Sequence, residues 1–333
     1  MKKILSCLLA AALLAGCSAP ASTPGPADAQ AASGDRLRVV TTIFPVYDWV
    51  RQVAGENADD LELTMLLDGS TDLHSFQPSA KDIADIADCD LFIYVGGSSD
   101  AWAEEALAES ANPDRRTLNL MELLGSRVYE EELVDGMEEE DGHEGHDHEE
   151  SEADEHIWTS LRNAQELSSA IADILAELDP DNAALYTGNA AAYGESLAAL
   201  DEQYATAVKS GPVKTLLFGD RFPFRYLVED YGLDYYAAFP GCSAETEASF
   251  ATVAFLAGKT EELNLPAVLT IEGSDGKIAQ TILQNAPGDR AVLTMDAMQA
   301  TSADDAAAGT TYLSVMEHNL TVLRQALGTE EAV

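Results

Sequence analysis

Basic residues are scarce in this sequence. Its 333 residues include 18 Lys and Arg against 59 Asp and Glu, which gives a formal net charge of −41. Proteins that bind the phosphate backbone of nucleic acids present a basic surface, so nucleic acid is excluded as a main partner. Such acidity suits solubility and the collection of cations.

Long hydrophobic runs are also absent, apart from one short run at the start. Two lysines precede the apolar stretch 4–14, which is too short to span a bilayer as a stable helix. The stretch ends in Leu-Ala-Gly-Cys, with Cys17 last, and is similar to a bacterial lipoprotein signal. We therefore expect residues 1–16 to be removed and Cys17 to carry lipid. The alternative is an ordinary secretory signal with a chance cysteine. Residues 17–36, rich in Ala, Ser, Pro and Gly, are typical of a flexible tether.

Cysteine is rare, with four residues in the whole chain. Cys7 leaves with the signal and Cys17 would be lipidated, so Cys89 and Cys242 remain. In an exported protein, one alternative for these two cysteines is a disulfide. They lie far apart in sequence and in what we take to be different lobes, and we favour two buried free thiols.

Short β-rich runs alternate with helical stretches on both sides of the middle of the chain. This alternation predicts an α/β fold with parallel sheets covered by helices, and the length suffices for two lobes, at 37–179 and 211–333. The expected strands are 37–42, 61–66, 91–95, 214–218, 267–271 and 291–295. The expected helices are 46–54, 79–87, 102–109, 224–231, 250–263 and 311–327.

A long helical region lies between the two halves. Pro180 is expected to start a new helix, because proline is tolerated at a helix start and not in its interior. A helix over 180–210 would be about 45 Å long at 1.5 Å per residue. The fold class is therefore two α/β lobes joined by one long rigid helix.

One segment, residues 130–155, holds fifteen acidic residues, three histidines and no Lys or Arg. Such a segment cannot bury a core, and we expect a mobile or disordered insertion in the first lobe. Its histidines, His143, His146 and His148, form a short His-rich acidic tract, which is typical of metal binding. We expect a low-affinity metal loop rather than the main site. The alternative is a solvated acidic loop with incidental histidines.

Two other histidines and three carboxylates flank predicted elements. His74 follows a strand and His156 precedes a helix, although either alone could be structural. Asp220, Glu272 and Asp296 each come just after a strand of the second half. Ligands of open α/β sheets bind at the carboxyl ends of strands, so these acids could face a common cleft. Helix capping is the alternative role for them.

Five stretches of the sequence carry motifs that can be compared with known families: Val39 to Pro45, His74 to Gly97 (HSFQPSAKDIADIADCDLFIYVGG), Asp154 to Ala164 (DEHIWTSLRNA), Phe224 to Leu233 (FRYLVEDYGL) and Tyr312 to Asn319. Together they resemble the zinc- and manganese-binding receptor lipoproteins of ABC transporters. Each is loose alone, but their order and spacing are specific and cover nearly the whole mature chain. The His-rich insertion also falls where zinc receptors of this family carry theirs.

This resemblance implies a four-ligand metal site between two lobes, with His74 and His156 as the first two ligands. The third ligand in the family is a His or Glu. A gapless alignment of the motif places Arg221 at that position, whereas an alignment with one inserted residue places Asp220 there. We expect Asp220 to be the third ligand. Asp296 matches the fourth ligand, and Glu272 is the reserve. Two imidazoles and two carboxylates suit Zn²⁺ and are hard enough for Mn²⁺, and the histidine loop favours zinc.

The implied function is capture of a divalent metal outside the cytoplasmic membrane and its delivery to an ABC-transporter permease. The protein would be a monomer that meets the membrane only through its lipid anchor. One rival interpretation is an extracytoplasmic metallohydrolase with Glu272 as general base, although no HExxH or GxSxG pattern is present. Another is a surface adhesin or metal buffer that serves no transporter.

Overall fold

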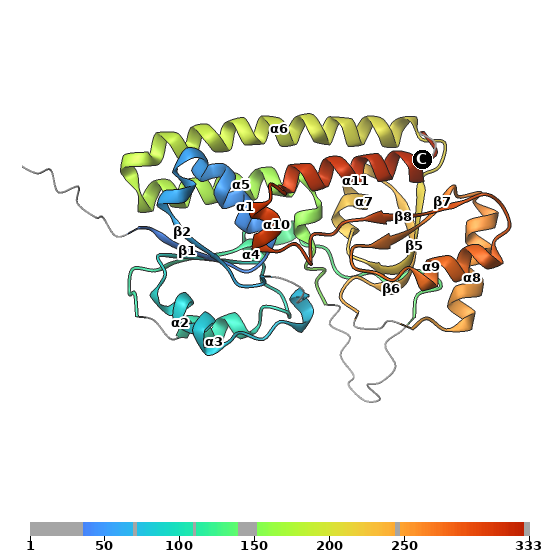
Figure 1. Cartoon of the computed structure of the whole chain (residues 1–333), viewed down its shortest axis with the longest axis horizontal. Coiled ribbons are helices and arrows are strands. Elements are labelled where there is room, and N and C mark those ends of the chain that lie inside the picture. The colour runs from blue at the N-terminus through green and yellow to red at the C-terminus, as the bar shows by residue number, and fades with distance from the viewer. Residues whose placement is uncertain (1–35, 69–71, 109–110, 139–151, 244–246, 330–333) are drawn as a thin grey trace, which may run out of the picture. The chain divides into compact units, whose positions relative to one another are not determined.

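The computed structural model describes residues 36–68, 72–108, 111–138, 152–243 and 247–329. From Arg36 onward the chain forms one compact unit. Two four-stranded parallel sheets lie side by side in it, as Figure 1 shows. The α/β fold expected from the alternating pattern is confirmed.

The first sheet is built by the first half of the chain, in the order β2-β1-β3-β4. Its strands are short and largely buried, and each is followed by helical structure that returns the chain for parallel pairing. The strands are β1 (Arg38–Thr41), β2 (Glu62–Met65), β3 (Leu91–Tyr94) and β4 (Arg116–Asn119). The helices are α1 (Phe44–Ala54), α2 (Ala80–Asp88), α3 (Trp102–Ala108) and α4 (Leu120–Leu124).

The second sheet has the order β6-β5-β7-β8, and all of its pairings are parallel. Its central strand β7 is buried at every position, as expected for a sheet covered on both faces. The strands are β5 (Thr215–Phe222), β6 (Asp234–Pro240), β7 (Ala267–Ile271) and β8 (Ala291–Met295). The helices are α7 (Arg225–Tyr231), α8 (Phe250–Glu262), α9 (Lys277–Asn285), α10 (Ala303–Ala307) and α11 (Tyr312–Ala326).

A long helix, α6 (Ala183–Ser210), runs above both sheets in Figure 1. It follows α5 (Leu161–Leu178) after a single 3₁₀ turn that begins at Pro180. With 28 residues, α6 is about 42 Å long. It contacts α5 and α1 over the first sheet and α11 over the second, so the predicted joining helix is confirmed.

The two halves share a hydrophobic core and hydrogen bonds between buried groups. One continuous cluster of buried side chains includes strands of both sheets. The indole of Trp158 donates to the carbonyl of Ala297 at 2.7 Å, and the Tyr312 hydroxyl donates to the carbonyl of Trp158 at 2.7 Å. Because Trp158 and Tyr312 are fully buried, separating the halves would expose them to water.

Some elements differ from the sequence expectations. Strands β4 and β6 and helix α9 were not anticipated, and β5 continues to Phe222 instead of ending at residue 218. The pairing of β5 with β6 shifts register between Phe218 and Arg221. A Cβ at Gly219 would lie 2.6 Å from the Cα of Ala279, so this glycine allows α9 to approach the strand closely.

Both described ends of the predicted acidic insertion hold a fixed place in the fold, so the expectation of a mobile segment was wrong for residues 130–138 and 152–155. Glu130 pairs with Ala153 in an antiparallel bridge, and the Glu131 amide donates to the Glu152 carbonyl at 2.8 Å. The side chains of Asp154 and Glu155 are buried. Acidic side chains are stable here because backbone amides and imidazoles accompany them. Residues 139–151, with His143, His146 and His148, lie outside the described residues.

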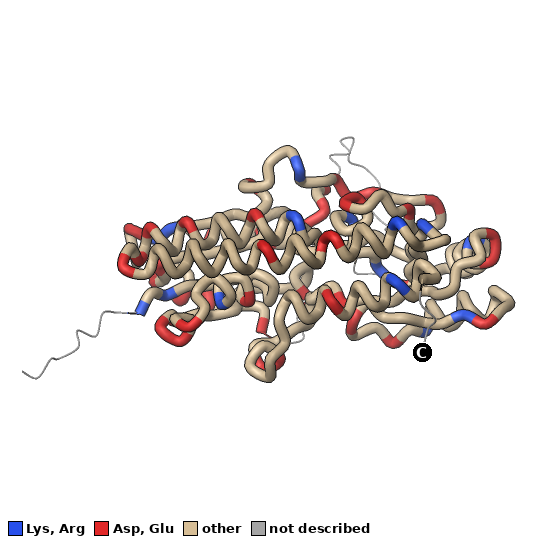
Figure 2. The backbone as a smooth tube through the Cα atoms, turned by 90° about the horizontal axis from the view of Figure 1, so that it is seen from above, with Lys and Arg blue, Asp and Glu red and all other residues tan. Residues whose placement is uncertain are grey.

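The excess of acidic residues is spread along the described chain, as the tube view in Figure 2 shows. Among the described residues no helix combines the length and apolar character needed to cross a membrane. Cys89 and Cys242 are both free, so the preference for two thiols over a disulfide is confirmed.

Candidate metal centre

His74 lies in a 3₁₀ turn, η2 (Leu73–Ser75), just past the carboxyl end of β2. Asp72 caps this turn, with its Oδ1 accepting from the His74 amide at 3.0 Å. The ring Nδ1 lies 2.8 Å from Ser99 Oγ and 3.5 Å from Glu155 Oε2. Both contacts are made by Nδ1, so they orient the ring and leave Nε2 available as a ligand atom.

His156 precedes the 3₁₀ turn η4 (Ile157–Thr159) and is fully buried. One oxygen of Asp154 fixes it twice, accepting from the His156 amide at 2.8 Å and contacting ring Nδ1 at 3.0 Å. A carboxylate on one imidazole nitrogen is the usual support of a metal-binding histidine, because it orients the ring and raises the basicity of the other nitrogen.

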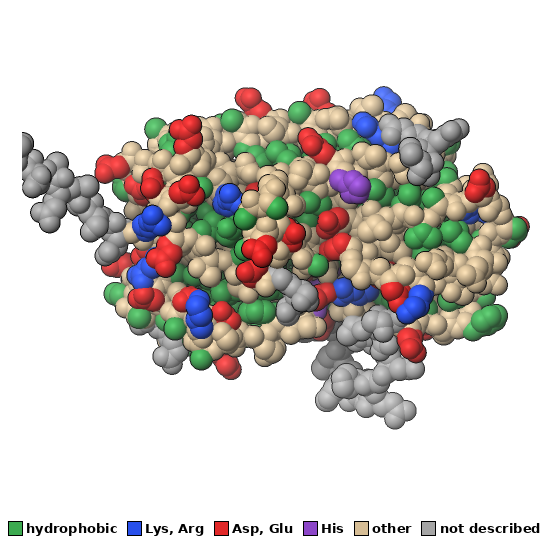
Figure 3. Space-filling view, in the orientation of Figure 1, with side chains coloured by type: hydrophobic (Ala, Val, Ile, Leu, Met, Phe, Trp, Pro, Cys, Tyr) green, Lys and Arg blue, Asp and Glu red, His purple; other side chains and the backbone are tan. Residues whose placement is uncertain are grey.

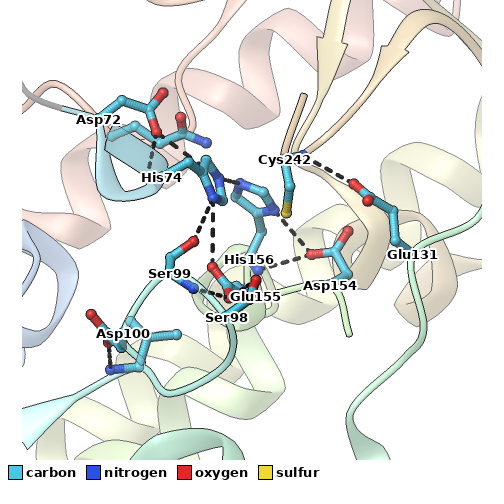
Figure 4. Close-up of polar contacts among 12 residues, drawn as sticks. Asp72, His74, Ser98, Ser99, Asp100, Glu131, Asp154, Glu155, His156 and Cys242 are labelled. Carbon is cyan, nitrogen blue, oxygen red and sulfur yellow. Dashed lines mark hydrogen bonds and ion pairs between the residues drawn. The ribbon is translucent and has the colours of Figure 1, made fainter. Parts of the chain in front are cut away.

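The two histidines meet through their free nitrogens. Nε2 of His74 lies 3.2 Å from Nε2 of His156. Figure 4 draws this contact as a dashed line between the two rings. If each ring carries its proton on the supported Nδ1, two lone pairs face each other across this gap. A cation between them would remove that repulsion, so the arrangement fits a metal ion.

The protonation states differ between the two rings. Burial, and then the charge of neighbouring His156, lower the pKa of His74 to about 4, so this ring is neutral near neutral pH. Burial would also lower the pKa of His156, but the nearby carboxylate of Asp154 outweighs it and raises that pKa. Any proton beyond the one that each neutral ring carries is therefore held by His156, and a metal ion must displace that additional proton to bind Nε2.

A sulfur atom is the third member of this group. One ligand atom each from His74, His156 and Cys242 lie within 4.8 Å of one another. Cys242 lies two residues after Pro240, the last residue of β6, at the carboxyl end of that strand. Burial, reinforced by the negative charges of Glu131 and Asp154, raises the pKa of its thiol, so the sulfur is protonated when no metal is present. In the part of the chain that the structure describes, no other group of three such side chains lies this close together.

Buried acids surround the three side chains. Glu155 is fully buried; its Oε1 accepts from the Ser99 amide at 2.8 Å and from Ser98 Oγ at 3.2 Å, while its Oε2 has no hydrogen-bond partner. Asp100 accepts from the amides of Val95 and Gly96 and so fixes the turn before Ser98. The carboxylates that contact the two rings, Glu155 at His74 and Asp154 at His156, make the interior there favourable for positive charge.

The three carboxylates expected as ligands each accept hydrogen bonds from backbone amides. Asp220 Oδ1 accepts from the Arg221 amide at 2.9 Å, and Asp296 Oδ1 accepts from the Met298 amide at 2.7 Å. The two oxygens of Glu272 accept from the amides of Ala297 and Gln299 at 2.7 and 2.8 Å. The structure thus brings His74 and His156 together without bringing Asp220, Asp296 or Glu272 into their group.

Asp220 and Glu272 line a cavity of about 530 Å³ beside the histidines. Asp72, Arg221 and Asp275 also line it, so its walls carry charges of both signs. Acidic side chains also gather near the middle of the face drawn in Figure 3. Two of the three expected carboxylates, Asp220 and Glu272, thus line this cavity, and Asp296 is not among its lining residues.

Arg221, at the position where a gapless match expects a ligand, makes an ion pair instead. Its Nη2 lies 2.6 Å from Asp72 Oδ2, and its Nη1 donates to the Ser243 carbonyl at 3.3 Å. One guanidinium thus ties the turn that carries His74 to the loop that carries Cys242. The contact joins the two halves of the chain next to the imidazoles.

A family model described as "Zinc-uptake complex component A periplasmic" matches residues 39–326. The chain belongs to this zinc-uptake component A family. The resemblance drawn from the sequence motifs is confirmed, and the zinc-uptake component A family is the periplasmic part of a zinc-uptake complex.

Two curated proteins are similar to nearly the whole chain. The zinc-binding lipoprotein AdcA of Streptococcus pneumoniae is 32% identical over 337 residues, which cover 99% of this chain and 62% of AdcA. The chain thus spans about three fifths of that relative. The high-affinity zinc uptake system protein ZnuA of Bacillus subtilis is 30% identical, covering 97% of this chain and 96% of ZnuA.

Solved structures agree with the fold. The Zn(II)-bound ZnuA-like domain of Streptococcus pneumoniae AdcA is 29% identical with a TM-score of 0.69, covering 88% of this chain and 99% of that domain. The metal-dependent lipoprotein YcdH of Bacillus subtilis is 26% identical with a TM-score of 0.69, covering 87% of this chain and 98% of that one.

Sequence reasoning missed Cys242 as a candidate ligand. The sequence feature that could have indicated it is the run Tyr235-Tyr236-Ala237-Ala238-Phe239, which lies within β6. The residues after this run lie at the carboxyl end of a strand, where ligands of open α/β sheets bind. Asp154 and Glu155 were quoted only as part of a motif. Their support of the imidazoles depends on side-chain direction, which the spacing alone does not give.

Proposed function

We propose that this chain captures a zinc ion between His74 and His156, outside the cytoplasmic membrane, and passes it to the permease of an ABC transporter. The observation that carries this proposal is the pair of Nε2 atoms 3.2 Å apart, each on a ring whose Nδ1 already has a partner. Tetrahedral zinc with two imidazole ligands at 2.0–2.1 Å would separate the nitrogens by about 3.3 Å. The pair therefore needs little rearrangement to hold the ion.

Relatives support zinc as the ion and transport as the purpose. AdcA is named as a zinc-binding lipoprotein, and the Bacillus subtilis ZnuA as a component of a high-affinity zinc uptake system. A component of an uptake complex needs a membrane partner, and an ABC permease is that partner in this proposal. The similarity to AdcA and ZnuA, which extends over nearly the whole chain, supports a role in uptake rather than that of a metal buffer without a transporter.

Release would come from the loops that carry the ligands. The continuous core and the buried contacts of Trp158 oppose a wide hinge between the two halves. Local movement of η2 and of the loop after β6 would separate His74 and Cys242 while α6 stays in place. The ion pair of Arg221 with Asp72 is the contact that the permease would have to disturb.

The enzyme alternative has little support in the chemistry of the site. A metallohydrolase needs a general base beside an open coordination position of the metal. Glu272, the expected base, has both oxygens occupied by backbone amides. We propose that the chain binds and releases its ion without chemistry.

Anchoring by Cys17 and action as a monomer complete the proposal. Residues 1–35, including Cys17, lie outside the described residues. The lipoprotein signal and the lipoprotein name of AdcA support the anchor. Mass spectrometry of the N-terminal peptide from the source bacterium should find a diacylglycerol-modified Cys17, and an unmodified cysteine there would contradict anchoring.

We further propose that the histidines at 143, 146 and 148 gather zinc weakly near the main site. Deleting residues 139–151 should remove weak zinc binding and leave one tight site unchanged. The remaining ends, Glu138 and Glu152, belong to described segments that hold their positions by backbone hydrogen bonds. Zinc titration monitored by calorimetry gives both stoichiometries, and a matched deletion at the tether, residues 20–32, serves as the control. Loss of the tight site in the 139–151 variant would contradict this division of roles.

The function as a whole is tested by zinc uptake in cells. A strain lacking this chain should take up radioactive zinc slowly from zinc-poor medium, and the wild-type chain should restore uptake. The His74→Ala/His156→Ala double variant, exported at equal level, should not. Equal uptake with both chains would contradict the proposal.

A further inference from the structure

The third side chain of the metal centre is a cysteine rather than the carboxylate that the sequence led us to expect. We propose that Cys242 binds the ion as a thiolate beside His74 and His156, and that the site therefore takes thiophilic divalent ions, zinc and cadmium, and rejects manganese. The inference rests on the proposed function and names the class of ion that the same site selects.

The geometry suits a His₂Cys set. In a tetrahedral site with a Zn–S bond of about 2.3 Å, the sulfur lies about 3.6 Å from each ligand nitrogen. Sγ of Cys242 already lies within 4.8 Å of the imidazole atoms of the group. It would therefore move by no more than about 1.2 Å, which a small side-chain rotation supplies. A water molecule would complete four-coordination.

The backbone next to Cys242 packs closely against the ring of His156. A Cβ at Gly241 would lie 3.1 Å from His156 Cε1 and 2.8 Å from the carbonyl oxygen of Phe222, so only glycine lets the loop approach the ring this closely. The Cys242 amide donates to Glu131 Oε1 at 3.0 Å, as Figure 4 shows. The next residue, Ser243, accepts from Arg221. The hydrogen bonds of Cys242 and Ser243 therefore fix the position of the loop, with the Cys242 sulfur close to the imidazoles.

Among the described residues, the sulfur of Cys242 is not held in a disulfide. The other described cysteine, Cys89, donates its thiol to the Ile86 carbonyl at 3.2 Å. When a divalent ion binds, the sulfur–hydrogen bond breaks, the sulfur–metal bond forms, and the proton leaves to solvent. No oxidant or other reactant is needed.

Ligand chemistry then determines which ions are retained. Thiolate sulfur binds zinc and other soft or borderline ions well, whereas Mn²⁺ prefers carboxylate, carbonyl and water oxygens. The expected oxygen ligands Asp220 and Asp296 are held by backbone amides instead. Replacing sulfur by oxygen at position 242 should therefore weaken zinc and cadmium much more than manganese.

Cobalt substitution tests the sulfur ligand directly. The full mature chain, stripped of metal and loaded with Co²⁺, should show a sulfur-to-cobalt charge-transfer band in the near ultraviolet together with visible bands of tetrahedral cobalt. The Cys242→Ser variant should lose the charge-transfer band and keep visible bands. The Cys89→Ala variant is the matched control and should keep both.

Competition titrations measure the consequence for selectivity. We expect Cys242→Ser to bind zinc about 10- to 100-fold more weakly and to lower the ratio of zinc to manganese affinity at least about tenfold. Wild-type protein with tight cobalt binding but no charge-transfer band would overturn the thiolate inference. An unchanged affinity ratio in Cys242→Ser would also overturn it. Both results leave capture by the histidines intact, whereas a wild-type chain that binds neither zinc nor cobalt contradicts the proposed function as well.

Discussion

Replacing His74 and His156 together by alanine should lower zinc affinity by about 1,000-fold or more. Each substitution removes one of the two nitrogens that face each other at 3.2 Å, and a single remaining thiol cannot hold the ion tightly. Competition with a chromophoric chelator measures the loss. Zinc at 100 times its dissociation constant should raise the free energy of unfolding of the wild type by about 2.7 kcal/mol, and the variant should lose this increase.

The control for this prediction is His318→Ala. His318 is exposed on α11 and lies outside the group of three, so this variant should keep wild-type affinity and zinc-dependent stabilisation. Melting of the metal-free proteins separates loss of binding from loss of fold. A double variant that is folded and still binds one zinc at wild-type affinity would contradict the assignment of the imidazoles.

Asp154→Asn should weaken zinc binding by about 10- to 100-fold although Asp154 is not expected to touch the ion. The carboxylate contacts both the backbone amide and ring Nδ1 of His156, and supporting groups of this kind typically have effects of that size. The amide is nearly the same size but lacks the charge. It would therefore leave the ring less well oriented and its Nε2 less basic.

The same substitution should lower the pKa of His156 in the metal-free protein. The charge of Asp154 raises that pKa against the effect of burial, so its removal leaves burial to dominate. Nuclear magnetic resonance of ring carbons across a pH titration measures this change. The matched control is Asp173→Asn on α5, which removes an exposed carboxylate and should alter neither quantity. Equal zinc affinity in Asp154→Asn and wild type would show that the carboxylate does not support the ligand.

The fold was largely predictable from the sequence because its signals are local. Short β-branched runs alternate with amphipathic stretches, and Pro180 marks the break before α6. Strand β6 was missed because its run is aromatic and alanine-rich and ends in Pro-Gly, and β5 was read too short because Gly219 and Asp220 imitate a strand end. A bulge in the middle of a strand gives little signal in a single sequence.

The site was predictable only in part, for a different reason. His74 and His156 stood out because histidine is rare in this chain and both flank recognisable elements. The third candidate ligand could not be identified from its position in the sequence. Its identity depends on which side chain of the second half of the chain points toward the imidazoles. Arg221 takes the place of a ligand in sequence and pairs with Asp72, while Cys242, from the loop after the next strand, reaches the histidines instead.

The most direct test of this account is a crystal structure of the zinc-loaded protein with anomalous data collected on both sides of the zinc absorption edge. The account predicts one strong anomalous peak between His74 and His156, about 2.0–2.1 Å from each Nε2 atom. A principal peak elsewhere, with the two imidazoles still in contact with each other and no metal between them, would contradict it.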